Sequence, residues 1–215
     1  ALLVSALLNI LFQREFIKRG ILDKINSRSS HQSLATRSGG SSLFSSLLLI
    51  SIFFYLNNNE IYDFSLLIPI AIMLVVGLYD DIYKLDFKLK FIFQIIVAKI
   101  IIDNGLIIDN LHGIFGIFEL SRILGQVFTI FIIVAIINSI NFIDGIDGLA
   151  ISVITLFLLL FELFSSNSSD MFFLTLIILG SILPLYFFNF RKKNKVFLGD
   201  SGSLFLGAVV SIYVL

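Results

Sequence analysis

Cysteine is absent from this sequence of 215 residues, so disulfide bonds and metal sites built from thiolates are excluded. Polar residues are scarce: 58% of the residues are hydrophobic and the mean hydropathy is +1.02, far above that of a soluble domain of this size. No basic region precedes the first apolar stretch, so a cleavable signal peptide is not expected. The formal net charge is zero, so the overall charge alone indicates no partner.

Apolar stretches dominate the chain. A bilayer core is crossed by about 20 mostly apolar residues, with a range of roughly 17 to 25. Eight stretches approach that length when they borrow flanking residues: 1–13, 43–56, 65–79, 88–102, 121–140, 148–164, 171–190 and 201–215. The sequence therefore predicts an all-α, polytopic membrane helix bundle of about eight transmembrane spans, forming a single integral membrane domain over residues 1–215. Because the chain starts at Ala1 and stops at Leu215 in an apolar run, we expect truncation inside a helix at both ends.

The basic residues gather in alternate connections. Thirteen of the fifteen Lys and Arg lie in residues 14–42, 80–90 and 191–200. The connections between these carry none; they are 57–64, 103–120 and 165–170. Since cytoplasmic loops carry the excess of Lys and Arg, the basic connections are expected on the cytoplasmic face, and alternation places the loop with Asp144 there too. In the outer segment 103–120, glycines interrupt the apolar pattern and predict a short hairpin.

Three acidic motifs stand at the cytoplasmic ends of the predicted spans: GLYDDIYKL with Asp80 and Asp81, NFIDGIDGLA with Asp144 and Asp147, and FLGDSGSLFLG with Asp200. Each has a purely structural alternative, because Asp caps helices and Asp-Gly pairs form turns. Together, five carboxylates brought close by a bundle would repel one another, and a hard divalent cation relieves such repulsion. Mg²⁺ suits this setting, with Mn²⁺ as an alternative, because it leaves positions open for water and substrate phosphates.

Four lysines stand beside these acids, where an ammonium group could hold phosphate oxygens: Lys84, Lys88, Lys90 and Lys195. Acid, metal and lysine at a membrane surface indicate phosphoryl transfer between a soluble and a lipid-borne partner. Carboxylates in a helical bundle also mark cation or proton transporters, which place their acids near the middle of the membrane. Only Glu162 lies inside an apolar run, so transport is the second alternative.

The three motifs, in this order, resemble those of the polyprenyl-phosphate N-acetylhexosamine-1-phosphate transferases. GLYDDIYKL is similar to the family's Asp-Asp motif, NFIDGIDGLA to its Asn-x-x-Asp-Gly-x-Asp-Gly motif, and FLGDSGSLFLG to its Phe-x-Gly-Asp-x-Gly-Ser motif. The segment LDKINSRSSHQSLATRSGG is similar to the first-loop signature, although Ile25 and Thr36 stand where proline is common. The resemblance covers essentially the whole chain. It implies a catalytic domain that transfers N-acetylhexosamine 1-phosphate from a UDP-sugar to polyprenyl (undecaprenyl) phosphate and releases UMP.

The resemblance also implies roles for the matching residues. The residues implied in catalysis are Asp80, Asp81, Lys90, Asp144 and Asp147. Among them, Asp80 and Asp81 would position the lipid phosphate or the metal, and Lys90 would contact phosphate. Asp200, together with Asp144, would ligate Mg²⁺. Asp144 and Asp147 would also help to hold the nucleotide.

Substrate binding is implied for a second set: Asn141, Phe197, Lys195, Arg28 and His31. Asn141 would hold the nucleotide and Phe197 would stack near the uracil. The expected setting is the bacterial cytoplasmic membrane, with the active site on the cytoplasmic face, no nucleic-acid partner, and a homodimer as one alternative for the oligomeric state. Within the family, the N-acetylglucosamine branch, which starts envelope polysaccharides, is favoured by Arg28 and His31 in NSRSSH. The alternative is the phospho-N-acetylmuramoyl-pentapeptide transferase of peptidoglycan synthesis.

Overall fold

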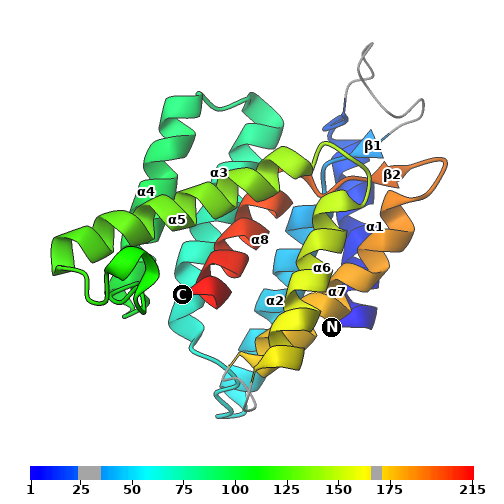
Figure 1. The fold of residues 1–215 in the computed structure, drawn as a ribbon. Helices are drawn as coiled ribbons and strands as arrows, with labels where there is room; N and C mark the ends of the chain where they lie inside the picture. Colours follow the sequence, from blue (N-terminus) through cyan, green and yellow to red (C-terminus); the bar gives the residue numbers. More distant parts are fainter. Residues whose placement is uncertain (24–34, 166–170) are drawn as a thin grey trace.

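The computed structural model describes residues 1–23, 35–165 and 171–215, and this part of the chain is built almost entirely of helices (Figure 1). The helices are α1 (Leu2–Lys18), α2 (Gly39–Leu56), α3 (Leu67–Tyr83), α4 (Phe87–Asp103), α5 (Arg122–Ile143), α6 (Leu149–Phe164), α7 (Phe172–Asn189) and α8 (Gly199–Val214). Two strands, β1 (Ala35–Thr36) and β2 (Lys195–Val196), and two 3₁₀ turns, η1 (Phe64–Leu66) and η2 (Ile114–Gly116), complete the elements. The all-α bundle is confirmed, and each helix falls on one of the eight predicted apolar stretches.

The helices differ in how well they match the thickness of a membrane. Within the described residues, four are long and apolar enough to cross one, namely Gly39–Leu56, Phe64–Tyr83 (which includes η1), Arg122–Ile143 and Phe172–Asn189. Helices α6 and α8 are apolar but only 16 residues long, or about 24 Å at 1.5 Å per residue, against a hydrocarbon core of about 30 Å. The chain is therefore a polytopic membrane protein, although half of its predicted spans fall short of full length or carry charges.

Helix α8 forms the centre of the bundle. Every residue from Ser201 to Tyr213 is buried, because α2, α3 and α5 all pack against this helix. A Cβ on Gly77 of α3 would lie 2.3 Å from the backbone oxygen of Asp200, so only glycine lets α3 approach α8 this closely. Figure 1 shows α5 crossing α3 and α8 obliquely, which brings the last turn of α5 to the beginning of α8.

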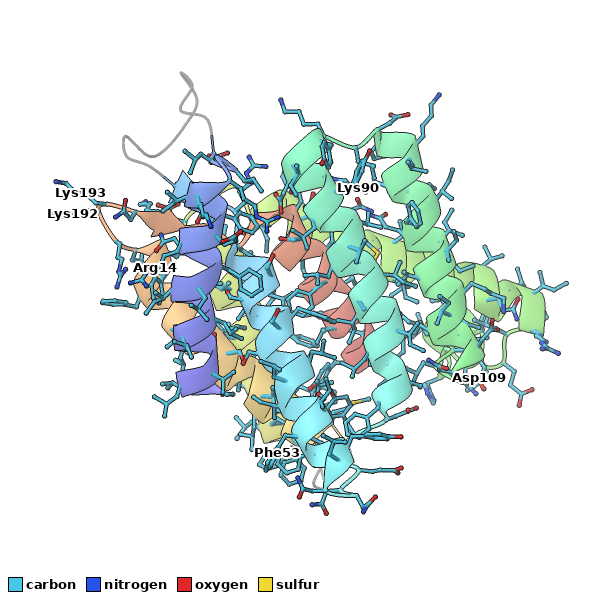
Figure 2. The ribbon with its side chains drawn as sticks, turned by 180° about the vertical axis from the view of Figure 1, so that it is seen from behind. Arg14, Phe53, Lys90, Asp109, Lys192 and Lys193 are labelled. Carbon is cyan, nitrogen blue, oxygen red and sulfur yellow. The ribbon has the colours of Figure 1, made fainter. Side chains whose placement is uncertain are left out.

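The connections alternate between two ends of the bundle, as the basic residues predicted. The turn between α3 and α4, the loop between α5 and α6, and the β1–β2 pair lie at one end, here called the carboxylate end (Figure 1). Figure 2 shows Lys90, Lys192 and Lys193 toward this end, and Phe53 and Asp109 toward the other. The hairpin predicted in residues 103–120 is confirmed, since the backbone N–H of Leu111 donates to the carbonyl of Phe118 at 2.7 Å.

The short β1–β2 sheet was not predicted from the sequence. It pairs Ala35 with Lys195 and Thr36 with Val196 in parallel. It continues as a hydrogen bond of 3.0 Å from the backbone N–H of Gly39 to the carbonyl of Phe197. The segment before α2, which belongs to the basic first loop, is thereby fixed beside the segment before α8, which leads to Asp200.

Candidate active site

Asp81, near the end of α3, holds the beginning of α8. Its carboxylate accepts hydrogen bonds from the backbone N–H groups of Asp200, at 3.0 Å, and Ser201, at 2.9 Å. The first N–H groups of a helix have no partner inside it, so this carboxylate satisfies donors that would otherwise be unpaired. Gly199, just before them, has a φ of +75°, and a Cβ there would lie 2.8 Å from Asp81. The contact determines where α8 presents the side chain of Asp200.

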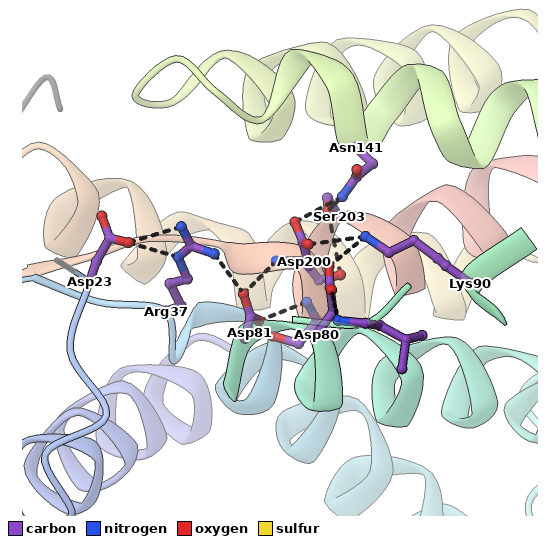
Figure 3. A network of polar contacts seen from close by, with 10 residues as sticks. Asp23, Arg37, Asp80, Asp81, Lys90, Asn141, Asp200 and Ser203 are labelled. Atoms are coloured by element: carbon purple, nitrogen blue, oxygen red, sulfur yellow. Dashed lines mark hydrogen bonds and ion pairs between the residues drawn. The ribbon is translucent and has the colours of Figure 1, made fainter. Parts of the chain in front are cut away.

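Lys90 of α4 lies between two carboxylates that come from different helices (Figure 3). Its ammonium group donates to Asp80 of α3 at 2.5 Å and to Asp200 at 3.2 Å. Asp80 also accepts from the backbone N–H of Leu85, at the turn between α3 and α4. One cation thus screens the repulsion between Asp80 and Asp200. The Asp200 side chain is 28% exposed, more than either neighbour, so its carboxylate is open to a ligand.

Asn141, in the last turn of α5, holds the other side of Asp200. Its Nδ2 donates to Oδ1 of Asp200 at 3.0 Å and to the hydroxyl of Ser203 at 2.8 Å. Lys90 and Asn141 therefore contact different oxygens of one carboxylate. Helices α3, α4, α5 and α8 all contribute to this arrangement, as Figure 3 shows.

Asp144 immediately follows α5 and faces the same group of acids. Burial, followed by the negative charges of Asp200 and Asp81, raises the pKa of its carboxyl to about 8. Arg37 and the backbone N–H of Gly199 oppose this rise. Because another carboxylate shifts a pKa only at short range, Asp144 belongs with Asp80, Asp81 and Asp200 in what we call the carboxylate cluster.

Arg37, between β1 and α2, reaches this cluster from the first loop. Its guanidinium contacts Asp23 at 2.9 and 3.0 Å and Oδ1 of Asp81 at 3.5 Å (Figure 3). The Asp81 side chain is fully buried, with 0% exposed. Sequence reasoning did not single out Arg37. The sequence feature that could have indicated it is RSGG at the end of the first-loop segment. However, Arg37 reaches α3 only because β1 pairs with β2.

Asp147, Lys195 and Phe197 form a second group. Lys195 of β2 makes an ion pair with Asp147, in the loop between α5 and α6. The same ammonium lies 5.9 Å from the ring centroid of Phe197, three residues before Asp200. An aromatic face, a cation and a carboxylate are together suited to a flat base and its polar substituents.

The structure thus brings the predicted residues together in two groups. The carboxylate cluster, Lys90 and Asn141 form one, and Asp147, Lys195 and Phe197 form the other. The predicted positions Arg28 and His31 lie outside the described residues. Lys84 and Lys88 are exposed, and neither forms an ion pair with an acid in the described ranges. Gln94 and Asn138, which sequence reasoning also missed, lie one helical turn from Lys90 and Asn141.

The donor set of the carboxylate cluster fits a divalent cation. Its four carboxyl groups outnumber the two cations that contact them, Arg37 and Lys90. The pKa of Asp144 is raised first by burial and then by the negative charges of Asp200 and Asp81, so these acids lie close enough to interact. Among the described residues, no group of three or more His, Cys, Asp or Glu side chains is arranged as a ready-made metal cage. Mg²⁺ does not need one, because it commonly takes one or two carboxylates and completes its shell with water and substrate phosphates.

Comparison with known proteins places the chain in a family. The model of glycosyl transferase family 4 matches residues 63–215, which contain all three acidic motifs. The chain belongs to this family. The matched residues run from before α3 through the α5–α6 loop to α8, the elements that carry the three motifs.

Three relatives from bacteria cover most of the chain. It is 34% identical over 219 residues to the probable undecaprenyl-phosphate N-acetylglucosaminyl 1-phosphate transferase of Bacillus subtilis (strain 168), covering 99% of this chain and 60% of that protein. It is 38% identical over 224 residues to the undecaprenyl-phosphate alpha-N-acetylglucosaminyl 1-phosphate transferase of Pasteurella multocida (strain Pm70). This match covers 96% of this chain and 60% of that protein. The protein of the same name from Haemophilus influenzae is 34% identical over 203 residues. This match covers 89% of this chain and 56% of that protein. The chain therefore spans about three fifths of the length of these relatives.

Proposed function

We propose that the protein containing this chain transfers N-acetylhexosamine 1-phosphate from a UDP-N-acetylhexosamine to polyprenyl phosphate. The observation that carries the proposal is the meeting of Asp80, Lys90, Asn141, Asp144 and Asp200 from separate elements at one end of the bundle. The names of the relatives support undecaprenyl phosphate as the acceptor and an N-acetylglucosamine donor.

The reaction requires two anions to approach each other. An oxygen of the lipid phosphate attacks the sugar-linked phosphorus of the UDP-sugar, and the bond from this phosphorus to the oxygen of the uridylyl phosphate breaks, so UMP leaves. Lys90, which is shared by Asp80 and Asp200, is placed to offset the negative charge of the phosphates. Asn141 keeps Asp200 in place, while Asp147, Lys195 and Phe197 bind the nucleotide.

No general base is needed for this attack. The second pKa of a phosphate monoester is about 6, so the lipid phosphate is largely a dianion at neutral pH. Asp81 has both oxygens bonded to the beginning of α8 and no exposed surface, so we assign it the role of positioning Asp200. Asp80, which is held by Lys90 and Leu85, positions that lysine.

Mg²⁺ is the proposed cofactor, with Mn²⁺ as a substitute. Asp200 and Asp144 would hold the ion, because the Asp200 carboxylate is partly exposed and Asp144 lies close enough for their charges to interact; binding of the ion would displace the proton that Asp144 otherwise keeps. The bound ion would supply Lewis-acid stabilisation of the diphosphate oxygens and of the leaving UMP. Asp80 and Lys90 would then complete the shell of charges around the reacting phosphates.

We place the carboxylate end on the cytoplasmic side of a bacterial inner membrane. The described basic residues of the alternate loops support this orientation, since cytoplasmic loops are the basic ones. UDP-sugars are soluble, so they reach the site from the cytoplasm, whereas polyprenyl phosphate reaches it within the bilayer.

Two alternatives receive less support. A phospho-N-acetylmuramoyl-pentapeptide transferase would use the same cluster, but the three relatives are all named for N-acetylglucosamine. A cation or proton transporter places its acids near the middle of the membrane. Here the carboxylates lie at helix ends beside Lys90 and Arg37, which suits an anionic substrate better than a cation pathway.

One assay on the full-length protein tests the proposal. Purified protein is mixed with UDP-N-acetylglucosamine, polyprenyl phosphate and Mg²⁺, and UMP release is followed. We expect release that depends on both the lipid phosphate and the metal. Release only from UDP-N-acetylmuramoyl-pentapeptide would select the other branch, and no release from any UDP-N-acetylhexosamine would contradict the enzyme assignment.

A further inference from the structure

Gln94 and Asn138 form a reciprocal pair of amides between α4 and α5. Nε2 of Gln94 donates to Oδ1 of Asn138 at 3.2 Å, and Nδ2 of Asn138 donates to Oε1 of Gln94 at 2.7 Å. Asn138 also donates to the carbonyl of Val134 in its own helix, at 2.8 Å. Gln94 is 1% exposed and stands in the otherwise apolar run FIFQIIVA. Asn138 is half-buried. Burying the amide of Gln94 is costly unless it is bonded, so packing alone would be served as well by an apolar side chain.

The pair lies one helical turn from two side chains of the carboxylate end. Lys90 precedes Gln94 by four residues on α4, and Asn141 follows Asn138 by three residues on α5, so each lies on the same helix face as its amide neighbour. Lys90 and Asn141 contact the two oxygens of Asp200 at 3.2 and 3.0 Å. A slide or rotation of α4 against α5 would therefore separate the groups that hold Asp200.

We infer that the Gln94–Asn138 pair is a positioning clamp, which sets the register of α4 on α5 and so holds Lys90 and Asn141 against Asp200. Two opposed amides make both hydrogen bonds at one axial and rotational setting, whereas apolar contacts tolerate sliding. The inference rests on the proposed function, because it assigns the pair a role in the same reaction. Misplacement of about 1 Å in such a site lowers the rate by about 10²-fold.

The test uses Gln94→Leu and Asn138→Leu, singly and together, in the full-length protein. We expect kcat to fall by about 10- to 100-fold in each variant, with a smaller change in KM for the UDP-sugar. The double variant leaves no amide without a partner, so it is the one to measure if a single variant does not fold. Thr175→Val is the matched control, because it removes buried hydrogen bonds at the opposite end of the bundle.

Coupling with Lys90 separates positioning from a loss of stability. Lys90→Met should cost much less in the Gln94→Leu background than in the wild type, since the lysine is already displaced. Additive losses, wild-type kcat in the double Leu variant, or an equal loss of kcat in Thr175→Val would each overturn the clamp.

A distance measurement tests the clamp without activity. Because this chain has no cysteine, spin labels attached through Lys88→Cys on α4 and Phe142→Cys on α5 report one distance once any cysteines elsewhere in the protein are replaced. We expect a narrow distribution with the amide pair intact and a broader or shifted one in the double Leu variant. An unchanged distribution would overturn the clamp, even if the protein released no UMP, so this result is separate from a failure of the proposed function.

Discussion

The two ends of the bundle hold polar groups of different kinds. At the end opposite the carboxylates, hydroxyl groups pair with one another. Tyr213 of α8 contacts Thr175 of α7 at 2.7 Å, Thr175 also donates to Glu162 of α6, and Ser51 pairs with Tyr62. We call the four residues that carry hydroxyl groups, Ser51, Tyr62, Thr175 and Tyr213, the hydroxyl cluster. At the carboxylate end, four acids share two cations, and the Asp200 side chain remains 28% exposed.

The difference separates a structural polar site from a binding site. Ser51 and Thr175 are 1% exposed and Tyr213 is 5% exposed, so the hydroxyl cluster is closed. Satisfied hydrogen bonds between uncharged hydroxyl groups add modestly to stability, and buried hydroxyl groups that are already paired do not provide a binding site for a ligand. The carboxylate cluster has more acids than cations and is accessible at Asp200, which is the setting in which we propose that a divalent cation binds. Mutations at the two ends should therefore affect different properties.

The largest effect is expected at Asp200. Asp200→Asn keeps the size of the side chain and removes its charge, so UMP release should fall by about 10³-fold or more while the protein stays folded. Asp86→Asn is the control, because Asp86 is an exposed acid at the beginning of α4. For each variant, steady-state kinetics measures UMP release and a thermal unfolding curve measures whether the protein stays folded. Normal turnover in Asp200→Asn would mean that the metal and phosphates bind elsewhere.

A smaller loss is expected at Lys90. Lys90→Met retains the aliphatic stem but leaves Asp80 and Asp200 facing each other without a cation, so kcat should fall by about 10²-fold. Lys88→Met, on an exposed position two residues away, should keep the wild-type rate. If both variants lost activity equally, general surface charge rather than the specific contacts of Lys90 would be responsible.

Asp144 should make stability depend on pH. Its folded pKa of about 8 lies above the ordinary value of 3.8, so the folded protein keeps a proton that the unfolded chain has released. Without Mg²⁺, the free energy of unfolding should therefore fall as the pH rises from the ordinary pKa of 3.8 to the folded pKa of about 8, and it should level off above that. Asp144→Asn should remove this part of the dependence, and Mg²⁺ should offset it in the wild type. Tm measured between about pH 5 and 9 checks both; a variant with the wild-type pH dependence would contradict the assignment.

The smallest effect belongs to the hydroxyl cluster. Tyr213→Phe removes one buried hydroxyl while Thr175 keeps its bond to Glu162, so stability should fall by about 0.5–1.5 kcal/mol. The kcat should not change, because the residue lies at the far end of α8. Denaturation in detergent together with the UMP assay measures the two properties. A loss of kcat without a loss of stability would remove the distinction between the two ends.

The helices could be predicted closely, for a physical reason. Backbone groups in a membrane must bond within their own segment, so apolar runs become helices and little else. The predicted span 121–140 corresponds to α5 at Arg122–Ile143, and 201–215 to α8 at Gly199–Val214. The β1–β2 pair could not be predicted, because strands of two residues show no alternation and join segments far apart in the chain.

The site was predicted where charge stood out against an apolar background. Asp80, Asp144 and Asp200 were conspicuous because a membrane protein rarely buries acids without use. Arg37 was hidden among other basic loop residues, and its contact with Asp81 depends on the unpredicted strand pair. Gln94 was visible as an isolated polar residue, but its partner Asn138 depends on how α4 packs against α5, which sequence periodicity does not give.

Local cleavage by a bound metal tests the account most directly. Fe²⁺ replaces Mg²⁺ in the full-length protein, and ascorbate with peroxide then generates radicals that cut the backbone near the ion. We predict cuts in three separate segments at once, near Asp80, Asp144 and Asp200, which excess Mg²⁺ suppresses and Asp200→Asn abolishes. Cuts confined to one of these segments, or cuts that persist in Asp200→Asn, would contradict a single ion held where these helices meet.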